Sequence, residues 1–312
     1  MRVTATLQEW EGHAAAPVGA ARARVSVRRG LLLTLRAPDG TIGQGEATPL
    51  PGYSREPFDD VRAALSNVAD ALGDDALDAP MEALSRTPVA SLVGVARFAV
   101  ETALLDLCAR RRGVALHALL RGDAKEAKVP VSAYVGAALD HGLVDATRAA
   151  LARGLGTVKV KLSGVGALFA REVSALRALR MAVPGRWRLR LDLNGAWSLA
   201  EATPDRFAAL ASVGAHFVEQ PVAVGSLRSL GWQVLPWAID ESLLDEGDLA
   251  HALTARESGG CVAAVATPSM SEGLSPQRAS NAREDGHVDD RDSQDRISRA
   301  RTERRHHKQR QQ

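Results

Sequence analysis

Cysteine and long apolar runs are scarce in this sequence. Its two cysteines, Cys108 and Cys261, are too few for a disulfide framework or a cysteine-based metal site. No stretch of about 18 or more apolar residues occurs, so the sequence predicts no membrane-spanning helix. The opening residues, MRVTATLQEWEGH, lack the basic and apolar segments of a signal peptide. We therefore expect a cytoplasmic protein that has no membrane partner.

An excess of charge of either sign is also missing. The chain carries 39 Lys and Arg residues against 37 Asp and Glu residues, which gives a net charge of +2 at pH 7. This balance gives no reason to expect a nucleic-acid partner. Apolar residues are abundant, at 46% of 312 residues, which is enough for a large core in one α/β unit or in two domains. The sequence leaves the oligomeric state open.

The last part of the chain differs in composition from the rest. Residues 271–312 contain ten basic and eight acidic side chains, no aromatic residue and few aliphatic ones. Such a segment cannot bury enough apolar surface to offset the entropy lost on ordering, so we predict a disordered charged tail. The abrupt change near residue 270 suggests the hypothesis of a frameshift or a truncation in the gene.

Residues 1–128 predict an α+β domain. The first fifty residues contain alternating and short apolar runs with a PDG turn, which is typical of an antiparallel meander. Helical apolar patterns follow over residues 56–72 and 91–113, and the second ends at Gly113 after an arginine-rich last turn.

From residue 129 to residue 270 the pattern changes to strands that alternate with helices, which predicts parallel β/α units. The expected strands are residues 129–136, 157–162, 188–195, 216–221, 237–242 and 261–268. The expected helices are residues 143–154, 168–183, 198–214 and 245–260. A closed barrel of this kind needs eight strands. The predicted fold class is therefore α/β, an incomplete (β/α) barrel of six readable strands with an N-terminal α+β domain.

Two lysines interrupt the apolar strand TVKVKL at residues 157–162. Residues two apart on a strand share a face, so Lys159 and Lys161 are expected to point the same way. A neighbouring ammonium disfavours the charged form of a lysine, which lowers its pKa and suits it to act as a general base. The alternative is that both side chains extend to solvent at the end of the sheet.

Acidic residues lie near the carboxyl ends of the next three predicted strands. They are Asp192, Glu219 and Asp240, with Glu241 beside the last. In a β/α barrel the active site is built at this end by residues from several strands. Three carboxylates that converge would repel one another unless a cation lies between them, and all-oxygen ligation suits Mg²⁺. The alternative is that each acid is bonded to nearby loop amides and holds no metal.

Four short motifs stand at the ends of successive predicted strands: KVK at 159–161, DLN at 192–194, EQP at 219–221 and DES at 240–242. Together and in this order they resemble the enolase superfamily, in the branch related to muconate-lactonising enzymes. The resemblance extends over residues 1–270, and it implies that the N-terminal domain caps the barrel. Within that branch, GEATPLPGYSREP at 45–57 and ARFAVETALLDL at 96–107 resemble o-succinylbenzoate synthases.

The resemblance implies a magnesium-dependent lyase, and it implies that Asp192, Glu219 and Asp240 hold the Mg²⁺. It further implies that Lys161 abstracts the α-proton of a small-molecule carboxylate in a syn-dehydration, while Lys159 tunes Lys161. In the family this reaction makes o-succinylbenzoate, a precursor of menaquinone.

Three further residues are expected to contact the substrate. Asn194 lies on the same face as Asp192, where it would orient a ligand or the substrate carboxylate. Tyr53 and Ser54 would lie on a loop of the N-terminal domain that closes over the substrate, and a plain turn explains them equally well.

The sequence departs from the family at its C-terminal end. The family carries a lysine at the end of the sixth strand, in a pattern like KPS, and this chain has Thr267 in the stretch AVATPSM. Strands seven and eight have no counterpart in the sequence, so we expect impaired activity. Two alternatives stay open: an N-acylamino-acid racemase or dipeptide epimerase on the same scaffold, and a non-catalytic remnant or binding protein. The identity of the carboxylate substrate also stays open.

Overall fold

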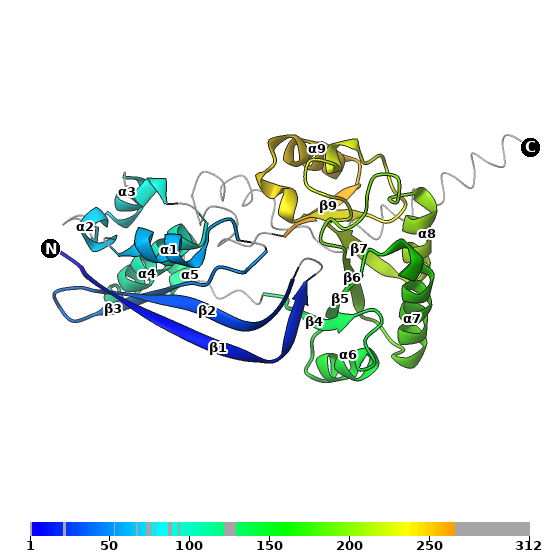
Figure 1. Ribbon diagram of the computed structural model, residues 1–312, viewed down its shortest axis with the longest axis horizontal. Helices are drawn as coiled ribbons and strands as arrows, with labels where there is room; N and C mark the ends of the chain where they lie inside the picture. The colour runs from blue at the N-terminus through cyan, green and yellow to red at the C-terminus, as the bar shows by residue number, and fades with distance from the viewer. Residues whose placement is uncertain are drawn as a thin grey trace, which may run out of the picture.

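The computed structural model describes two β-sheets and the helices that pack on them (Figure 1). It describes residues 2–20, 23–52, 54–66, 68–72, 76–77, 79–86, 89–92, 94–121 and 129–265. A three-stranded antiparallel sheet lies in the N-terminal part, and a six-stranded parallel sheet lies in the C-terminal part. This is the α/β class with an N-terminal α+β part that the sequence predicts.

The N-terminal sheet is an antiparallel meander in the order β1–β2–β3. Its strands are β1 (Thr4–Ala20), β2 (Ala23–Arg36) and β3 (Ile42–Ala47). The turn into β3 contains Gly40, whose φ of 86° suits glycine because this residue has no Cβ. The meander predicted for the first fifty residues is present.

The helices of the N-terminal part are shorter and more numerous than the sequence pattern predicts. They are α1 (Phe58–Leu65), α2 (Val68–Leu72), α3 (Pro80–Ser85), the 3-10 helix η1 (Val89–Ser91), α4 (Gly94–Arg111) and α5 (Leu116–Arg121). The single helix predicted over residues 56–72 is wrong, because α1 ends at Leu65 and Ser66 caps it. The Ser66 N–H donates to the Ala63 carbonyl, and the Ser66 hydroxyl donates to the Arg62 carbonyl at 2.8 Å.

The C-terminal sheet consists of six parallel strands in sequence order. They are β4 (Ser132–Ala137), β5 (Thr157–Lys161), β6 (Arg188–Asp192), β7 (Ala215–Glu219), β8 (Trp237–Ile239) and β9 (Cys261–Ala264). All six predicted strands are present, although most are shorter than their patterns. Residues 266–268 of the last pattern and the tail of residues 271–312 lie outside the described residues.

Helices connect these strands as the alternation predicts. They are α6 (Leu143–Ala152), α7 (Phe169–Ala182), α8 (Pro204–Ser212) and α9 (Glu246–Glu257), with the 3-10 helices η2 (Gly166–Leu168), η3 (Leu227–Ser229) and η4 (Glu241–Leu244). The prediction that α8 starts at residue 198 is wrong. Thr203 has an extended backbone and its hydroxyl accepts from the Arg206 N–H, so the first turn starts at Pro204.

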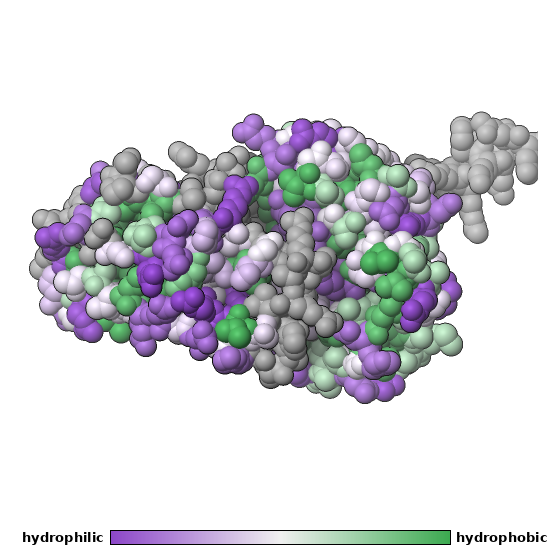
Figure 2. All heavy atoms as spheres, viewed as in Figure 1, coloured by the Kyte–Doolittle hydropathy of each residue, from purple (hydrophilic) through white to green (hydrophobic). Residues whose placement is uncertain are grey.

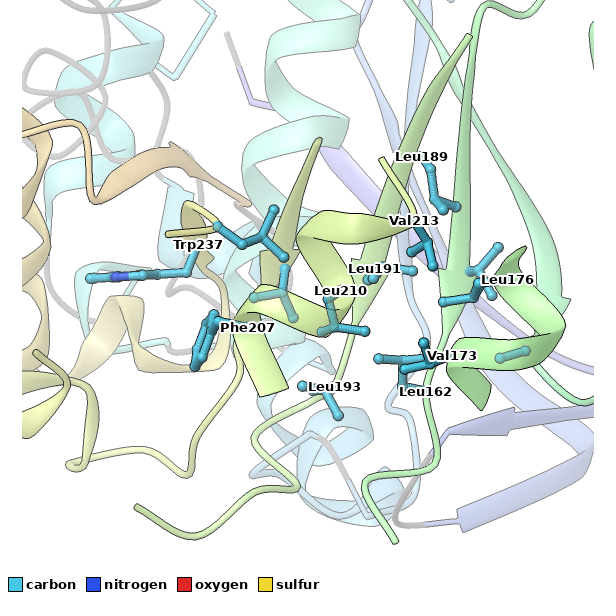
Figure 3. Packing of buried hydrophobic residues seen from close by; sticks show 14 of the residues in the cluster. Leu162, Val173, Leu176, Leu189, Leu191, Leu193, Phe207, Leu210, Val213 and Trp237 are labelled. Carbon is cyan, nitrogen blue, oxygen red and sulfur yellow. The ribbon is translucent and has the colours of Figure 1, made fainter. Parts of the chain in front are cut away.

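Each part of the chain has a separate apolar core. One cluster of buried residues lies within residues 3–108, and the other lies within residues 135–261. Figure 3 shows Leu189 and Leu191 of β6 in the second cluster, together with Leu176 of α7. The two clusters are consistent with two domains, but the predicted division after residue 128 stays a prediction.

The exposed face in Figure 2 mixes hydrophilic and hydrophobic residues over both parts of the chain. Among the described residues, none of the helices has the length and apolar character needed to cross a bilayer.

Candidate metal centre

The parallel register places charged side chains in one row at the carboxyl end of the sheet. Lys161 of β5 pairs with Asp192 of β6, and Asp192 pairs with Glu219 of β7. Glu219 pairs with Ala238 of β8, and Asp240 follows two residues later. The structure thus brings the predicted base and the three predicted acids to one end of four neighbouring strands.

The two lysines share one face of β5, as the strand period predicts. Val158 and Val160 are completely buried on the opposite face, where they belong to the apolar core. Lys159 and Lys161 are half-buried on the face that carries the acids. The valines therefore anchor the strand and leave the lysines facing the centre.

Lys159 joins two of the acids. Its Nζ donates a hydrogen bond of 2.6 Å to Glu219 Oε1 and lies 2.9 Å from Asp192 Oδ2. Burial lowers the pKa of Lys159, but the two carboxylates more than offset this and raise the pKa to about 12. The ammonium therefore stays charged at neutral pH and acts as a cation between two acids.

Lys161 has no such bridge in the structure. Burial lowers the pKa of Lys161; the charge of Asp192 raises it, and that of Lys159 lowers it. The net result is a lowered pKa, as the sequence predicts for a general base, but burial rather than the charge of Lys159 is the largest cause. Its role as the base stays a prediction.

The acids at the centre are buried close to one another. Burial, followed by the charges of Glu241 and Glu219, raises the pKa of Asp240 to about 8. Burial and the charge of Asp192 raise the pKa of Glu219, although Lys159 opposes them. A cation among these carboxylates would relieve their repulsion and favour the charged forms.

Asn194 and Glu241 add buried oxygen atoms to the centre. The backbone N–H of Asn194 donates to Asp192 Oδ1 at 2.9 Å, and its Nδ2 donates to Glu241 Oε1 at 3.0 Å. Within the described structure, Asn194 Oδ1 and Glu241 Oε2 are buried and have no hydrogen-bond partner. Such oxygens are expected to find a donor, a water or an ion.

This set of donors fits Mg²⁺, because carboxylate and amide oxygens are the protein ligands that this ion prefers. The geometry is not yet that of a metal site. Over the described ranges, His, Cys, Asp and Glu side chains form no group of three that could already hold a metal ion. The Lys159 ammonium lies where two of the acids meet.

Sequence reasoning missed part of this centre. Tyr134 of β4 pairs with Lys159 in the parallel register. Burial, followed by the charges of Asp140 and Asp192, raises the pKa of its phenol. No signal in the sequence points to Tyr134, because its pairing with Lys159 depends on the register between the two strands. Glu241 was visible as the second acid of DES but was given no role.

The predicted substrate contacts on the N-terminal loop receive less support. The Ser54 N–H donates to the Leu50 carbonyl at 2.8 Å, and the Ser54 hydroxyl accepts from the Leu50 N–H at 2.8 Å. Ser54 therefore closes a turn, as the alternative interpretation holds. Tyr53 and Thr267 lie outside the described residues.

Two family models match most of the chain. The "Mandelate racemase / muconate lactonizing enzyme, N-terminal domain" matches residues 2–121. The "Enolase C-terminal domain-like" model matches residues 142–276. The two matches follow the order that the sequence predicts.

Curated relatives of several named activities match at similar levels. Muconate cycloisomerase 1-2 of Acinetobacter lwoffii is 30% identical over 72% of this chain and 60% of its own length. An o-succinylbenzoate synthase of Geobacillus kaustophilus is 32% identical over 69% of this chain and 57% of its own. An L-Lys-D/L-Arg epimerase of Methylococcus capsulatus is 32% identical over 72% of this chain and 63% of its own. The matched region is thus less than two thirds of each of these relatives.

Solved structures show the same fold. A muconate lactonizing enzyme of Pseudomonas fluorescens, complexed with muconolactone, has a TM-score of 0.72 at 24% identity, over 91% of this chain and 77% of its own. A dipeptide epimerase of Methylococcus capsulatus, complexed with Mg and the dipeptide L-Arg-D-Lys, has a TM-score of 0.72 at 27% identity. That match covers 89% of this chain and 78% of the epimerase.

Proposed function

This chain belongs to the enolase superfamily, in the branch of mandelate racemase and muconate lactonizing enzyme, and we propose that it binds Mg²⁺ and abstracts a proton next to a substrate carboxylate. The observation that carries the proposal is the row of Lys161, Asp192 and Glu219 at paired positions of three neighbouring strands. Asp240 completes the acids from the fourth strand.

Asp192, Glu219 and Asp240 are the proposed metal ligands. The bridge that Lys159 makes between two of them supports this, because these acids already hold one cationic group. When bound, Mg²⁺ supplies positive charge that makes the carbon next to a substrate carboxylate more acidic. The solved dipeptide epimerase with bound Mg has the same fold, which adds support.

Lys161 is the proposed proton acceptor. A lysine accepts a proton only as a neutral amine, and the lowered pKa of Lys161 increases the neutral fraction. Lys159 stays protonated and holds Asp192 and Glu219 in place. Asn194 Nδ2, which donates to Glu241, fixes the orientation of the Asn194 amide beside the acids.

The proposed reaction is the dehydration carried out by o-succinylbenzoate synthases, which would place the chain in menaquinone biosynthesis. Lys161 would take the α-proton of a hydroxylated cyclohexadiene carboxylate. The hydroxyl group would take up a proton from the protonated Lys161 and leave as water, and the ring would become aromatic. The motif GEATPLPGYSREP at residues 45–57 and the relatives named as such synthases support this choice.

Dipeptide epimerisation is the second candidate, because relatives and a solved structure of that activity match equally well. An epimerase needs a base on each face of the α-carbon. Thr267 stands where the family's opposite lysine is expected, and threonine cannot act as that base. The dehydration needs only one base, so we favour it.

The same threonine is expected to reduce dehydration. A preorganised charged group near developing negative charge often supplies ~3–4 kcal/mol. We therefore expect activity at least ~100-fold below that of a synthase that carries this lysine, since ~1.4 kcal/mol corresponds to a tenfold change in rate.

Calorimetric titration with Mg²⁺ tests the metal ligands. Glu219→Gln keeps the shape of the side chain and removes its charge, so Mg²⁺ affinity should fall by ~10-fold or more. Glu101→Gln is the matched control, because Glu101 is a buried acid paired with Arg97 at 2.8 Å in the other core. Equal affinity in Glu219→Gln and the parent would count decisively against the assignment.

Incubation in D₂O with Mg²⁺ tests the reaction. Loss of the α-proton from the cyclohexadiene carboxylate, with growth of aromatic absorbance, is expected for a dehydratase. Conversion of a dipeptide to its diastereomer would instead support the epimerase. Lys161→Ala should abolish either signal, and the same rate in parent and variant would refute the role of Lys161.

A further inference from the structure

Asp240 lies just after the end of β8, where the backbone is no longer that of a regular strand. β8 ends at Ile239, and Asp240 has φ −133° and ψ −89°, outside both the strand and the helical regions. The next residues form the short η4. The direction of the Asp240 carboxylate therefore depends on whatever holds this turn.

Gln220, the residue that follows β7, holds the turn at residues 240–242 through its side-chain amide. Its Oε1 accepts from the Asp240 N–H at 3.0 Å and from the Ser242 N–H at 3.2 Å. Its Nε2 donates to the Val222 carbonyl and to Ser242 Oγ, both at 2.8 Å. The side chain is fully buried, and its amide makes the four hydrogen bonds that an amide can make.

Ser242 links Gln220 to α9 through its hydroxyl group. Its hydroxyl is fully buried and donates to Asp248 Oδ2 at 2.7 Å. Asp248, also fully buried, accepts from the Gly225 N–H at 2.7 Å and from the Arg228 N–H at 3.0 Å. Burial raises the pKa of Asp248, but these three donors lower it below its ordinary value.

We propose that Gln220, Ser242 and Asp248 are positioning residues that fix the backbone of residues 240–242 and thereby aim the Asp240 carboxylate. We call these three the Gln220–Asp248 network. Its members come from three segments: the residue that follows β7, the helix η4 and the first turn of α9. As far as it concerns Mg²⁺, the inference rests on the proposed function.

The network gives a role to Asp248, a fully buried carboxylate outside the proposed metal ligands. Asp248 accepts from the N–H of Gly225, before η3, and from the N–H of Arg228, within η3, and the same carboxylate accepts from the Ser242 hydroxyl. A shift of the segment from Gly225 to Arg228 would therefore reach the backbone of residues 240–242 through the side chains of Asp248 and Ser242. Groups that orient metal ligands in this way commonly change metal affinity 10–100-fold when they are replaced.

Ser242→Ala is the first test, because it removes only the hydroxyl that links Gln220 to Asp248. Thr147→Val is the matched control: Thr147 is fully buried in α6, and its hydroxyl donates to the Leu143 carbonyl at 2.8 Å. Both variants lose one buried hydroxyl donor. Calorimetry should show Mg²⁺ affinity about tenfold or more lower in Ser242→Ala and unchanged in Thr147→Val.

Amide hydrogen exchange of the metal-free chain is the second readout. Ser242→Ala should speed exchange in residues 240–242, whereas Thr147→Val should leave that segment unchanged. Gln220→Met keeps the length of the side chain and should show both effects, so it tests the network if Ser242→Ala fails to fold. Ser242→Thr retains a hydroxyl, so its exchange rate in residues 240–242 and its Mg²⁺ affinity should both be closer to those of the parent than the values of Ser242→Ala are.

Each outcome decides one of the two claims. Parent-like exchange and affinity in Ser242→Ala and Gln220→Met would overturn the network, and so would equal losses in Thr147→Val. If the parent binds no Mg²⁺, the proposed function fails, while the exchange of residues 240–242 still supports or overturns the positioning role.

Discussion

Asp240 gives the candidate metal centre a defined pH response. Its pKa is raised from an ordinary 3.8 to about 8, first by burial and then by Glu241 and Glu219. Between these values the folded metal-free chain holds a proton that the unfolded chain has released. The free energy of unfolding of the metal-free chain should therefore fall as pH rises from about 4 to about 8.

Metal binding should respond to pH in the opposite direction. Mg²⁺ needs the charged carboxylate, so binding below pH ~8 must expel the Asp240 proton. Affinity should thus rise with pH by up to about tenfold per unit until pH ~8 and then level off. Calorimetry across this range in buffers of different ionisation enthalpy measures both the affinity and the protons released.

The control for this prediction is Asp240→Asn, which cannot titrate. In this variant the free energy of unfolding of the metal-free chain should depend less on pH between about 4 and about 8, and the remaining dependence comes from groups such as Glu219, whose pKa is also raised. Affinity for Mg²⁺ that does not change from pH ~6 to pH ~8 in the parent would contradict the assignment of Asp240 as a ligand.

Some residues of the centre were predictable because strand periodicity is local. Lys161 and Asp192 stand at the last positions of β5 and β6, and alternation alone indicates their face. The bridge from Lys159 was not predictable, because it depends on how far a flexible side chain reaches across two strands. The Gln220–Asp248 network was hidden for a similar reason, since its partners come from three segments.

At the scale of elements, two glycines allow α4 to lie directly against β3. A Cβ at Gly45 would overlap the carbonyl oxygen of Ala99 and lie 2.9 Å from the Ala103 nitrogen. A Cβ at Gly43 would be similarly crowded against the backbone of α4. These contacts are with helix backbone, which cannot move aside as a flexible side chain can.

Gly45→Ala should therefore destabilise the N-terminal core by about 1–3 kcal/mol or more, as expected for overpacking. The fall should appear as a lower denaturation midpoint in urea. Gly142→Ala is the matched control, because no atom outside its chain neighbours lies within 4 Å of a Cβ there. Similar midpoints in the two variants would show that α4 and β3 can separate without cost.

Helix and strand types were easier to predict than their ends. The sequence alternation was sufficient for the six parallel strands, because each carries a short apolar run bounded by turn residues. The start of α8 was missed although Thr203 and Pro204 form a recognisable start signal. The break after α1 gave a weaker signal, since it depends on the local hydrogen bonds of Ser66.

At the scale of the whole molecule, the parallel sheet has two outer strands. Of the described strands, β4 pairs only with β5, and β9 pairs only with β8. Unpaired strand edges present N–H and C=O groups that can template pairing with another chain. Apolar side chains are exposed at or beside both edges: Val129 and Val131 before β4 are 77% and 60% exposed, and Val262 on β9 is 39% exposed.

The purified chain should therefore self-associate and bind the dye ANS strongly. Sedimentation velocity at increasing concentration measures the association. Val131→Lys places a charge beside the β4 edge and should reduce it, because charged residues at edges oppose pairing. A monodisperse monomer with a sharp thermal transition and little ANS binding would contradict this prediction.

The row of Lys161, Asp192 and Glu219 at the ends of paired strands also has a consequence for the evolution of such a protein. Each of these strands is followed by its own loop, so a substitution in one loop can be selected while the charged row, whose members depend on one another through Lys159, is kept. New chemistry can thus be acquired in single, independent steps. The segment from Gln220 to Asp248 is the exception, because its buried side chains satisfy one another. A laboratory that recombines these loops between homologues should exchange that segment as one block.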